Sequence, residues 1–465
     1  MEKDQKKIRQ TVFLTVISIL VLALLAFAWY ESQKSYYGPS KKSGQTPTTG
    51  QTTSETIEQK VDSTGYLQEG GEITKSDLFY TASSKNASAV LVRKGGKLTL
   101  DKIKISKTGD SSSSDESSFF GLNAAVLAKS SSTIMISNSA IEAKGKGANG
   151  AFANGSGSII SLQNSSVTAS GDGAHAIMAT QGGTVVLNKV SLITDKAHSG
   201  AIATDRGGGL IKADNGSVKT YGTDSPGIYS TGDIIVSDYD ISAANSEAAV
   251  IEGSNNIILN NVNLSSALAD KWGIMIYQSF SGDAQGSTGN FEMTGGSLTD
   301  SGANSPLFYV NNSIGLIKLA GVDIKTVSGI IAKAAANSRW GKSGSNGGNI
   351  QLLGTGQTLT GNIIADNIST VSLNLTSSSL LKGAINTDKT AKEASLSLDK
   401  SSHWEIAGDS YLTVLTDKDG LSGKTITNIS GQGHNVYYNS SNTGNSYLGG
   451  KTYALTGGGE LKPYK

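Results

Sequence analysis

The sequence predicts an all-β protein, a right-handed parallel β-helix that follows one apolar N-terminal helix. The first observation behind this prediction is a repeat of about 25 residues, each unit of which holds three short runs of alternating apolar residues. The second is a predominantly apolar run at residues 11–30 that contains no charged residue. The third is a composition rich in Gly, Ser, Asn and Thr and free of Cys, which suits many tight turns between short strands.

The repeat is clearest between residues 124 and 277, where aligned apolar residues lie 26, 25, 25, 26, 22 and 24 positions apart. Strands this short cannot bury one face by themselves, so successive units must stack as coils whose strands pair in parallel. No unit contains a helix-length pattern with a 3.6-residue period, which excludes a solenoid of helices. The aligned residues are Val126, Phe152, Ile177, Ile202, Ile228, Val250 and Ile274.

A polar residue recurs at the corner between the second and third strands of each unit. Asn tolerates the left-handed backbone conformation that a sharp corner requires. Stacked Asn side chains can also hydrogen-bond from one coil to the next. This arrangement resembles the asparagine ladder of parallel β-helix proteins, and the alternative is a row of ligand-binding side chains. The six positions are Asn138, Asn164, Asn188, Asn215, Asp238 and Asn261.

The N-terminal run predicts export. At about 1.5 Å per residue, residues 11–30 would span roughly 30 Å, the thickness of one hydrocarbon core. Basic residues precede the run, and Trp29 and Tyr30 end it, which places residues 1–10 in the cytoplasm and the rest of the chain outside. Two alternatives stay open: an uncleaved transmembrane anchor, or a signal peptide cut after Ala28.

Composition divides the chain into five parts. The Thr-, Ser- and Gln-rich stretch after the apolar run is typical of a flexible linker. The Tyr-rich C-terminal segment is expected to cap strand edges at the end of the stack. The predicted parts are a cytoplasmic tail (1–10), a transmembrane or signal helix (11–30), a linker (31–75), the β-helix (76–430) and a C-terminal cap (431–465).

Near the C-terminus, the stretch from Trp404 through Gly408-Asp409-Ser410 to Leu412 and Leu415 resembles the closing coils of pertactin-like autotransporter passengers. The repeat as a whole resembles the pectin-lyase-like fold. These resemblances imply a surface-displayed β-helix with an adhesin-like role. They also bring an alternative, because pectin lyases and polygalacturonases use the same fold.

An enzyme of this fold would need an acid–base group and, in the pectate lyases, clustered carboxylates that hold calcium. Asp172, Asp195 and Asp224 fall in corresponding loops of the repeat, which would place them along one edge. With His198 and Arg206 nearby, the best catalytic candidates are Asp172, Asp195, His198 and Arg206, and Ca²⁺ is the one cofactor that they suggest. The alternative is that Asp occupies these turns for local hydrogen bonds. A net charge of +1 gives no electrostatic case for nucleic acid.

Insertions into the repeat favour a binding function. One carries Trp272 and Tyr277, another carries Arg339 and Trp340, and a third at 107–121 is a polar loop that ends in two Phe residues. Insertions in a solenoid map to loops on one face, so we expect the first two to form one patch. Planar aromatic rings beside polar and basic groups suit a sugar ring, which stacks on an aromatic face. The alternative is that both Trp side chains plug the base of their loops.

We therefore expect a non-catalytic adhesin or polysaccharide-binding protein, displayed on a bacterial cell surface or outside the cell. Its partner would be a polysaccharide or a ligand on a host or cell surface, and residues 11–30 would contact the membrane. The alternative function is that of an extracellular polysaccharide lyase or glycoside hydrolase of the pectin-lyase-like fold.

Overall fold

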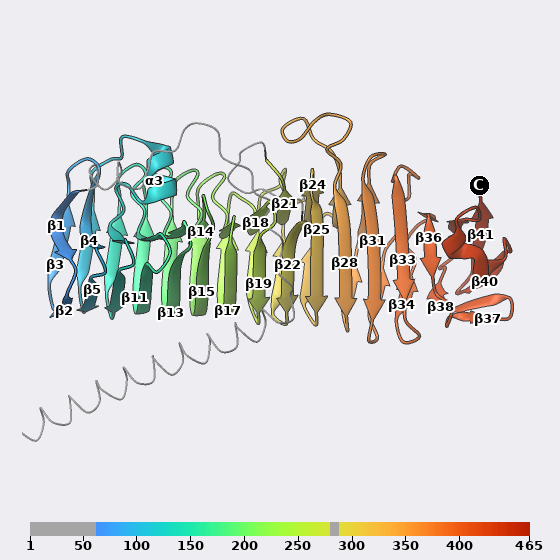
Figure 1. The fold of residues 1–465 in the computed structure, drawn as a ribbon. Coiled ribbons are helices and arrows are strands. Elements are labelled where there is room, and N and C mark those ends of the chain that lie inside the picture. The colour runs from blue at the N-terminus through green and yellow to red at the C-terminus, as the bar shows by residue number, and fades with distance from the viewer. Residues whose placement is uncertain (1–61, 280–287) are drawn as a thin grey trace, which may run out of the picture. The chain divides into compact units, whose positions relative to one another are not determined.

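The computed structural model describes residues 62–279 and 288–465, which form a parallel β-solenoid of about 16 turns (Figure 1). Each strand pairs in parallel with the equivalent strand of the next turn, apart from two antiparallel pairs near the C-terminus. The predicted all-β parallel solenoid is therefore confirmed. The transmembrane or signal helix predicted at 11–30 lies outside the described residues. Among the residues that are described, no helix has the length and apolar character required to cross a membrane.

Each turn of the solenoid contributes strands to three faces, of which the first is a sheet of twelve parallel strands. The strands of the first face are β1 (Asp62–Glu69), β4 (Ala87–Arg93), β7 (Val126–Lys129), β10 (Ala151–Asn154), β12 (Ile177–Thr180), β14 (Ile202–Thr204), β16 (Ile228–Ser230), β18 (Ala249–Glu252), β21 (Ile274–Tyr277), β24 (Phe308–Asn311), β27 (Ile330–Ala334) and β30 (Asn362–Ala365).

The second and third faces meet at a corner that four long strands cross without a break. These are β11 (Ile159–Ala169), β13 (Gly183–Thr194), β15 (Gly209–Thr220) and β17 (Asp233–Ala243). The other strands of the second face are β2 (Glu72–Ser76), β5 (Lys97–Asp101), β8 (Thr133–Ser137), β19 (Asn256–Asn260), β22 (Thr288–Thr294), β25 (Ile314–Ala320), β28 (Asn349–Thr355), β31 (Thr370–Thr376), β33 (Glu393–Leu398) and β36 (Val414–Thr416). Those of the third face are β3 (Phe79–Ala82), β6 (Lys104–Lys107), β9 (Ala140–Ala143), β20 (Asn263–Ser266), β23 (Ser297–Asp300), β26 (Asp323–Thr326), β29 (Thr358–Thr360), β32 (Leu380–Lys382), β34 (His403–Glu405), β38 (Thr425–Ser430) and β40 (Tyr453–Thr456).

The pairing register corrects the repeat alignment in two turns. Ala151 and Ala249 occupy the inward positions of the first face in line with Val126, and both are fully buried in the core. Phe152 and Val250, which the repeat alignment places inside, each lie one residue later. A shift of one residue moves a side chain to the opposite side of a strand. Phe152 and Val250 therefore point out of the first face, where inserted loops cover them.

Left-handed residues form the corner between the second and third faces. Five of the six predicted positions adopt this conformation, but Asn188 does not, because Lys189 occupies the corner in that turn. The Asn and Asp side chains at the corner are exposed, and the Nδ2 of Asn261 donates a hydrogen bond to Oδ1 of Asp238 at 2.5 Å. The corner residues of these turns, all with φ between 47° and 56°, are Asn138, Asn164, Lys189, Asn215, Asp238 and Asn261.

The buried hydrogen-bonding stack lies one residue beyond this corner. Ser139 and Ser165 directly follow the left-handed residues of their turns and are buried. The hydroxyl of Ser165 accepts the backbone N–H of Ser139 at 3.1 Å, and the hydroxyl of Ser139 accepts that of Ile103 at 2.9 Å. At another corner, the hydroxyl of Ser225 accepts the N–H of Ser199 in the same way at 3.0 Å. Serine side chains thus tie successive turns together from inside.

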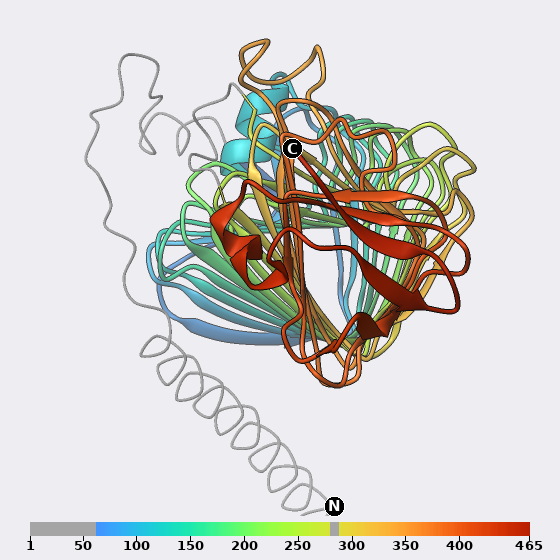
Figure 2. The same ribbon diagram turned by 90° about the vertical axis from the view of Figure 1, so that its right-hand side faces the viewer.

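The two ends of the solenoid differ. The first described strand, β1, begins at Asp62, inside the predicted linker, and parallel pairing continues through the predicted cap by way of β35 (Ser410–Leu412), β39 (Val436–Asn439) and β41 (Glu460–Tyr464). Antiparallel pairing of β41 with β40, and of β37 (Leu421–Ser422) with β38, ends the regular repeat. Figure 2 shows these elements and the 3₁₀-helix η1 (Thr443–Leu448) lying across the C-terminal end of the stack.

Candidate functional site

Two inserted loops meet on the outside of the first face. The ring of Trp272 stacks on that of Tyr309, with centroids 4.2 Å apart and planes inclined by 6°. The ring of Trp340 packs on Tyr277 at 5.3 Å, and the guanidinium carbon of Arg339 lies 4.7 Å from the centroid of Trp340. The structure thus brings the four predicted binding residues together with Tyr309. We call these five residues the aromatic cluster.

The loop that carries Arg339 and Trp340 is held by its own hydrogen bonds. The Oδ1 of Asn337 accepts the backbone N–H groups of Arg339 and Trp340, both at 2.9 Å. The Nδ2 of Asn346 donates to the carbonyl oxygens of Asn337 and Trp340, both at 2.7 Å. An Asn side chain that bonds backbone groups ahead of it fixes a turn without regular secondary structure. In Figure 1 this loop (orange) projects on the same side of the solenoid as helix α3 (Ser114–Phe120).

The aromatic cluster covers an apolar floor. Val250 and Met275 are buried outward residues of β18 and β21, and Tyr277 and Tyr309 are buried beside them. Trp272 and Trp340 remain only partly buried. Each indole therefore packs over the apolar floor, as expected if the Trp side chains plug the base of their loops. Each indole also keeps part of its surface exposed, where a ligand could stack.

A buried carboxylate that the sequence did not reveal lies beneath the cluster. Glu252, the last residue of β18, accepts hydrogen bonds from the hydroxyls of Tyr229, Tyr277 and Ser279, and the Tyr277 bond measures 2.9 Å. Burial, together with the negative charge of Glu252, raises the pKa of both tyrosines well above the ordinary value. Both phenols therefore remain protonated and act as donors. Their hydrogen bonds and that of Ser279 stabilise the charged carboxylate inside the protein.

Asp172 and Asp224, which the sequence placed along one edge, form an exposed row with His198. The Nδ1 of His198 lies 3.4 Å from Asp172, and its Nε2 lies 3.9 Å from Asp224. The side chains of His198, Asp172 and Asp224 are 67%, 51% and 47% exposed, so water screens these pairs. Lys271 donates a hydrogen bond to Asp224 and lowers the pKa of that carboxyl. Asp224 therefore stays ionised and paired.

Of the four predicted catalytic residues, the structure brings Asp172 and His198 together. Asp195 lies three residues before His198 in the same turn, and its backbone N–H bonds the carbonyl of Ala169. Arg206 follows β14, whereas His198 precedes it, and the Arg206 guanidinium carbon lies 4.1 Å from the ring centroid of Phe119. Across 62–279 and 288–465, no three His, Asp or Glu side chains gather in a way that could hold a metal ion.

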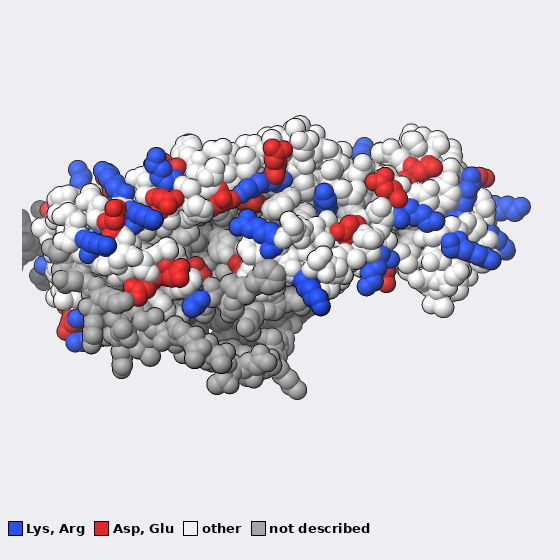
Figure 3. All heavy atoms as spheres, turned by 90° about the horizontal axis from the view of Figure 1, so that it is seen from above, with Lys and Arg blue, Asp and Glu red and all other residues white. Residues whose placement is uncertain are grey.

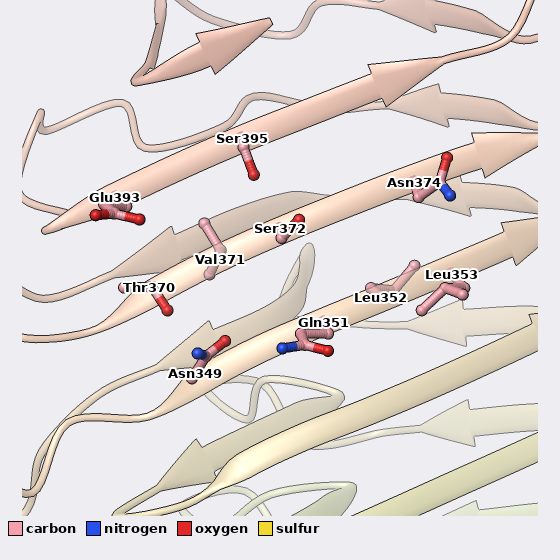
Figure 4. A pocket seen from close by; sticks show the side chains of 10 residues that line it. All are labelled: Asn349, Gln351, Leu352, Leu353, Thr370, Val371, Ser372, Asn374, Glu393 and Ser395. Atoms are coloured by element: carbon pink, nitrogen blue, oxygen red, sulfur yellow. The ribbon is translucent and has the colours of Figure 1, made fainter. Parts of the chain in front are cut away.

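A hollow of about 380 Å³ lies on the outside of the second face, across β28, β31 and β33 (Figure 4). The side chains that point into it are mostly short amides and hydroxyls, and one carboxylate, Glu393, lies at its edge. A polar hollow of this kind offers hydrogen bonds but no paired acid and base. Its polar lining residues are Asn349, Gln351, Thr370, Ser372, Asn374, Glu393 and Ser395.

No protein-family model, no curated protein and no solved structure matches the chain. The stretch that resembles autotransporter passengers forms core near the C-terminal end of the solenoid. The indole Nε1 of Trp404 donates to the carbonyl of Gly383 at 2.8 Å, and Trp404, Leu412 and Leu415 are fully buried. These residues therefore have a packing role in this chain, and the adhesin-like role remains a prediction.

Proposed function

We propose that this protein is a non-catalytic, surface-displayed adhesin that binds polysaccharide through the aromatic cluster. The observation that carries the proposal is the stacked pair of Trp272 and Tyr309, held on the first face beside the Arg339–Trp340 pair. A sugar presents a C–H face that packs on an aromatic ring, while its hydroxyls bond nearby polar groups. Side chains that are already fixed by packing lose little entropy when a ligand binds, which favours affinity.

The chemistry around the cluster favours binding over turnover. Cleavage of a glycosidic bond needs an acid and a base that both reach the bond. Glu252 is buried and engaged by three hydroxyls, and Asp224 is paired with Lys271. Neither carboxylate is therefore available as a general acid or a general base. The predicted partners therefore remain polysaccharides or cell-surface ligands, with residues 11–30 as the proposed membrane contact.

The proposal is tested by incubating the full chain, in detergent micelles, with an array of plant and microbial polysaccharides. We expect retention of at least one polysaccharide, and a tenfold or larger loss of affinity in Trp272→Ala because the stacking surface is removed. Phe79→Ala is the matched control, since Phe79 is an exposed aromatic residue in the first turn. Equal binding by Trp272→Ala and the parent protein would place the binding surface elsewhere.

The same incubation separates binding from catalysis. We expect the retained polysaccharide to be recovered at its original length, without new reducing ends or unsaturated ends. Turnover that Asp195→Ala abolishes would instead favour the lyase or hydrolase alternative. Addition and removal of Ca²⁺ in that assay tests the calcium prediction directly.

A further inference from the structure

A buried Asp side chain near the C-terminal end of the solenoid has no partner of opposite charge. Asp417 directly follows β36 and leads into the hairpin of β37 and β38 (Figure 1). Figure 3 shows that the Asp and Glu side chains visible on one side of the solenoid lie among Lys and Arg side chains. Asp417 differs from those acids, since it is fully buried and forms no ion pair within residues 62–279 and 288–465. A buried carboxylate without such a partner needs another source of stabilisation.

Only one oxygen of the Asp417 carboxylate is hydrogen-bonded. Its Oδ1 accepts the backbone N–H of Gly420 at 3.1 Å and the Nδ2 of Asn428 at 3.0 Å. Its Oδ2 has no hydrogen-bond partner among the described residues, and neither has the Oδ1 of Asn428. Asn428 is 6% exposed, and its Nδ2 also donates to the carbonyl of Ser402 at 3.2 Å, which fixes the orientation of the amide. Two acceptor oxygens are therefore buried without a donor.

The unpartnered oxygens border one small space beside Gly420. A β-carbon built on Gly420 would lie 2.6 Å from each oxygen of the Asp417 carboxylate and closer still to the Oδ1 of Asn428. Three oxygen atoms therefore face the same side of this glycine. Oxygen atoms that carry negative charge repel one another unless a positive group lies between them. Ca²⁺ takes carboxylate and Asn carbonyl oxygens as ligands at about 2.3–2.6 Å.

The charges around this space favour a cation. Asp419 is exposed on the same loop, and its negative charge acts on Asp417. Lys418, which lies between them in the sequence, places its Nζ 5.9 Å from the ring centroid of Tyr447. Burial raises the pKa of Asp417 and the charge of Asp419 raises it further, although two hydrogen bonds and His403 act in the opposite direction. A bound cation relieves the same electrostatic cost that a bound proton relieves.

We propose that Asp417 and Asn428 hold a divalent cation, with Ca²⁺ favoured over Mg²⁺. Both carboxylate oxygens of Asp417 and the amide oxygen of Asn428 supply three ligands, and water at the exposed loop completes the roughly six to eight that Ca²⁺ takes. Mg²⁺ demands a nearly ideal octahedron, which a bidentate carboxylate does not offer. This site lies apart from the loops of Asp172 and Asp224, for which the sequence suggested Ca²⁺. The inference goes beyond the proposed function and does not depend on it.

A cation at this position would join several parts of the C-terminal end. The backbone N–H of Asp417 donates to the hydroxyl of Tyr447 in η1 at 3.1 Å, and that hydroxyl donates to the carbonyl of Leu415 at 3.0 Å. Asn428 lies on β38 and bonds Ser402 of the preceding turn. A ligand that binds only the folded state stabilises it, so we expect the cation to raise the stability of the folded protein.

The test uses the full chain in a non-ionic detergent, stripped of metal with EGTA and dialysed, and titrated with CaCl₂ or MgCl₂ in a calorimeter. We expect a single Ca²⁺ to bind per chain with a Kd of about 10⁻⁴ M, and Mg²⁺ to bind about tenfold more weakly or less. Added Ca²⁺ is expected to raise the midpoint of thermal unfolding, followed by circular dichroism. Because a proton competes for the carboxylate, Ca²⁺ affinity should fall as the pH is lowered. Absence of Ca²⁺ binding would overturn the inference.

Two substitutions change the charge of the site in opposite directions. Asp417→Asn is expected to weaken Ca²⁺ binding about tenfold or more, to abolish the Ca²⁺-dependent rise in the unfolding midpoint, and to leave the midpoint without Ca²⁺ at least as high as that of the parent protein. Asn428→Asp is expected to lower the midpoint without Ca²⁺, because two buried carboxylates then repel each other, and Ca²⁺ is expected to restore it.

The matched control is Asp388→Asn, which removes one negative charge from an exposed Asp elsewhere in the solenoid. This variant is expected to keep the Ca²⁺ affinity and the thermal response of the parent protein. Unchanged Ca²⁺ affinity in Asp417→Asn would overturn the assignment of the site. A loss of stability in Asn428→Asp that Ca²⁺ does not reverse would overturn it as well.

Discussion

In one buried carboxylate, that of Asp300, only one of the two oxygens has hydrogen-bond partners. Asp300, the last residue of β23, is buried, and its Oδ1 accepts hydrogen bonds from the Ser266 hydroxyl at 3.0 Å and from the Gly302 N–H at 3.2 Å. Its Oδ2 has no hydrogen-bond partner among the described residues. Burial therefore raises the pKa of Asp300 to about 6, although the two hydrogen bonds act in the opposite direction.

This raised pKa predicts a pH dependence of stability. In the unfolded chain the carboxyl ionises near pH 4, whereas in the folded protein it ionises near pH 6. Its contribution to the free energy of unfolding is complete below pH 4 and is lost as the pH rises through 6, by roughly 2 kcal/mol after allowance for solvent screening. Asp300→Asn removes this titration. We expect the variant to gain stability relative to the parent protein between pH 4 and pH 7, as measured by urea unfolding. A constant difference across that range would contradict the assignment.

Single residues were predicted well where backbone geometry decides them. A left-handed corner favours Asn, and five of the six corner positions were located from that preference. At the sixth corner, Lys189 adopts the left-handed conformation although the neighbouring Asn188 has the stronger preference for it. Pairing with the adjacent turns decides the position there, and the local sequence does not indicate it. The Ser139–Ser165 stack was missed because Ser is common on the surface of this chain as well. Glu252 was missed because its role depends on hydroxyls from neighbouring turns.

At the scale of one turn, glycines allow the coils to approach closely. A Cβ on Gly171 would lie 1.9 Å from the carbonyl oxygen of Gly145, and a Cβ on Gly145 would lie 2.0 Å from that of Gly109. These three glycines stack at the loop between the third and first faces. Because backbone blocks the space, a larger residue there must push neighbouring turns apart.

We therefore expect Gly171→Ala to lower the free energy of unfolding by about 1–3 kcal/mol. Gly408→Ala is the control, since its Cβ would meet the nearest atom, the Cβ of Ala384, at an ordinary 3.6 Å. Thermal unfolding followed by circular dichroism compares the two variants. If both are equally stable, the close approach of the turns in the structure is wrong.

The inserted segments show which elements could be predicted from the sequence and which could not. Trp272, Tyr277, Arg339 and Trp340 were expected to meet because insertions in a solenoid project on one face. The segment 107–121 was expected to be a loop, yet it contains α3. The signal was present, since Ser113 caps the helix by accepting the Glu116 N–H at 3.2 Å. A short polar helix has no apolar periodicity to reveal it.

Across the whole solenoid, the period fixes the architecture but not the register. Each turn repeats the same three strands, so many copies reinforce one weak pattern. A slip of one residue within a turn leaves the period almost unchanged, which is why Phe152 and Val250 were aligned with Val126. The true register places both under the inserted loops. The outside of the first face, which carries the candidate site, is for this reason the part that the sequence described least well.

The last prediction concerns the C-terminal end of the stack. In a solenoid each turn contacts only its neighbours, so the terminal turns must protect the last strand edges. Removal of residues 431–465 deletes β39, β40 and β41, and exposes the edges of β35 and β38 with which β39 and β40 pair. We expect the shortened chain to keep its β-sheet circular dichroism, because the remaining turns still contact one another, but to associate through the exposed edges.

Light scattering coupled to size-exclusion chromatography, in the same detergent, measures this association. Deletion of Lys465 alone is the control, since this residue is exposed and follows the last strand. Oligomers or aggregates are expected for the chain that ends at Ser430, and not for the control. If the shortened chain stays unassociated, then the edges of β35 and β38 do not need to be covered by the C-terminal strands. Loss of the β-sheet signal along the entire chain would show that the solenoid folds as one cooperative unit, against the nearest-neighbour behaviour that stacked turns imply.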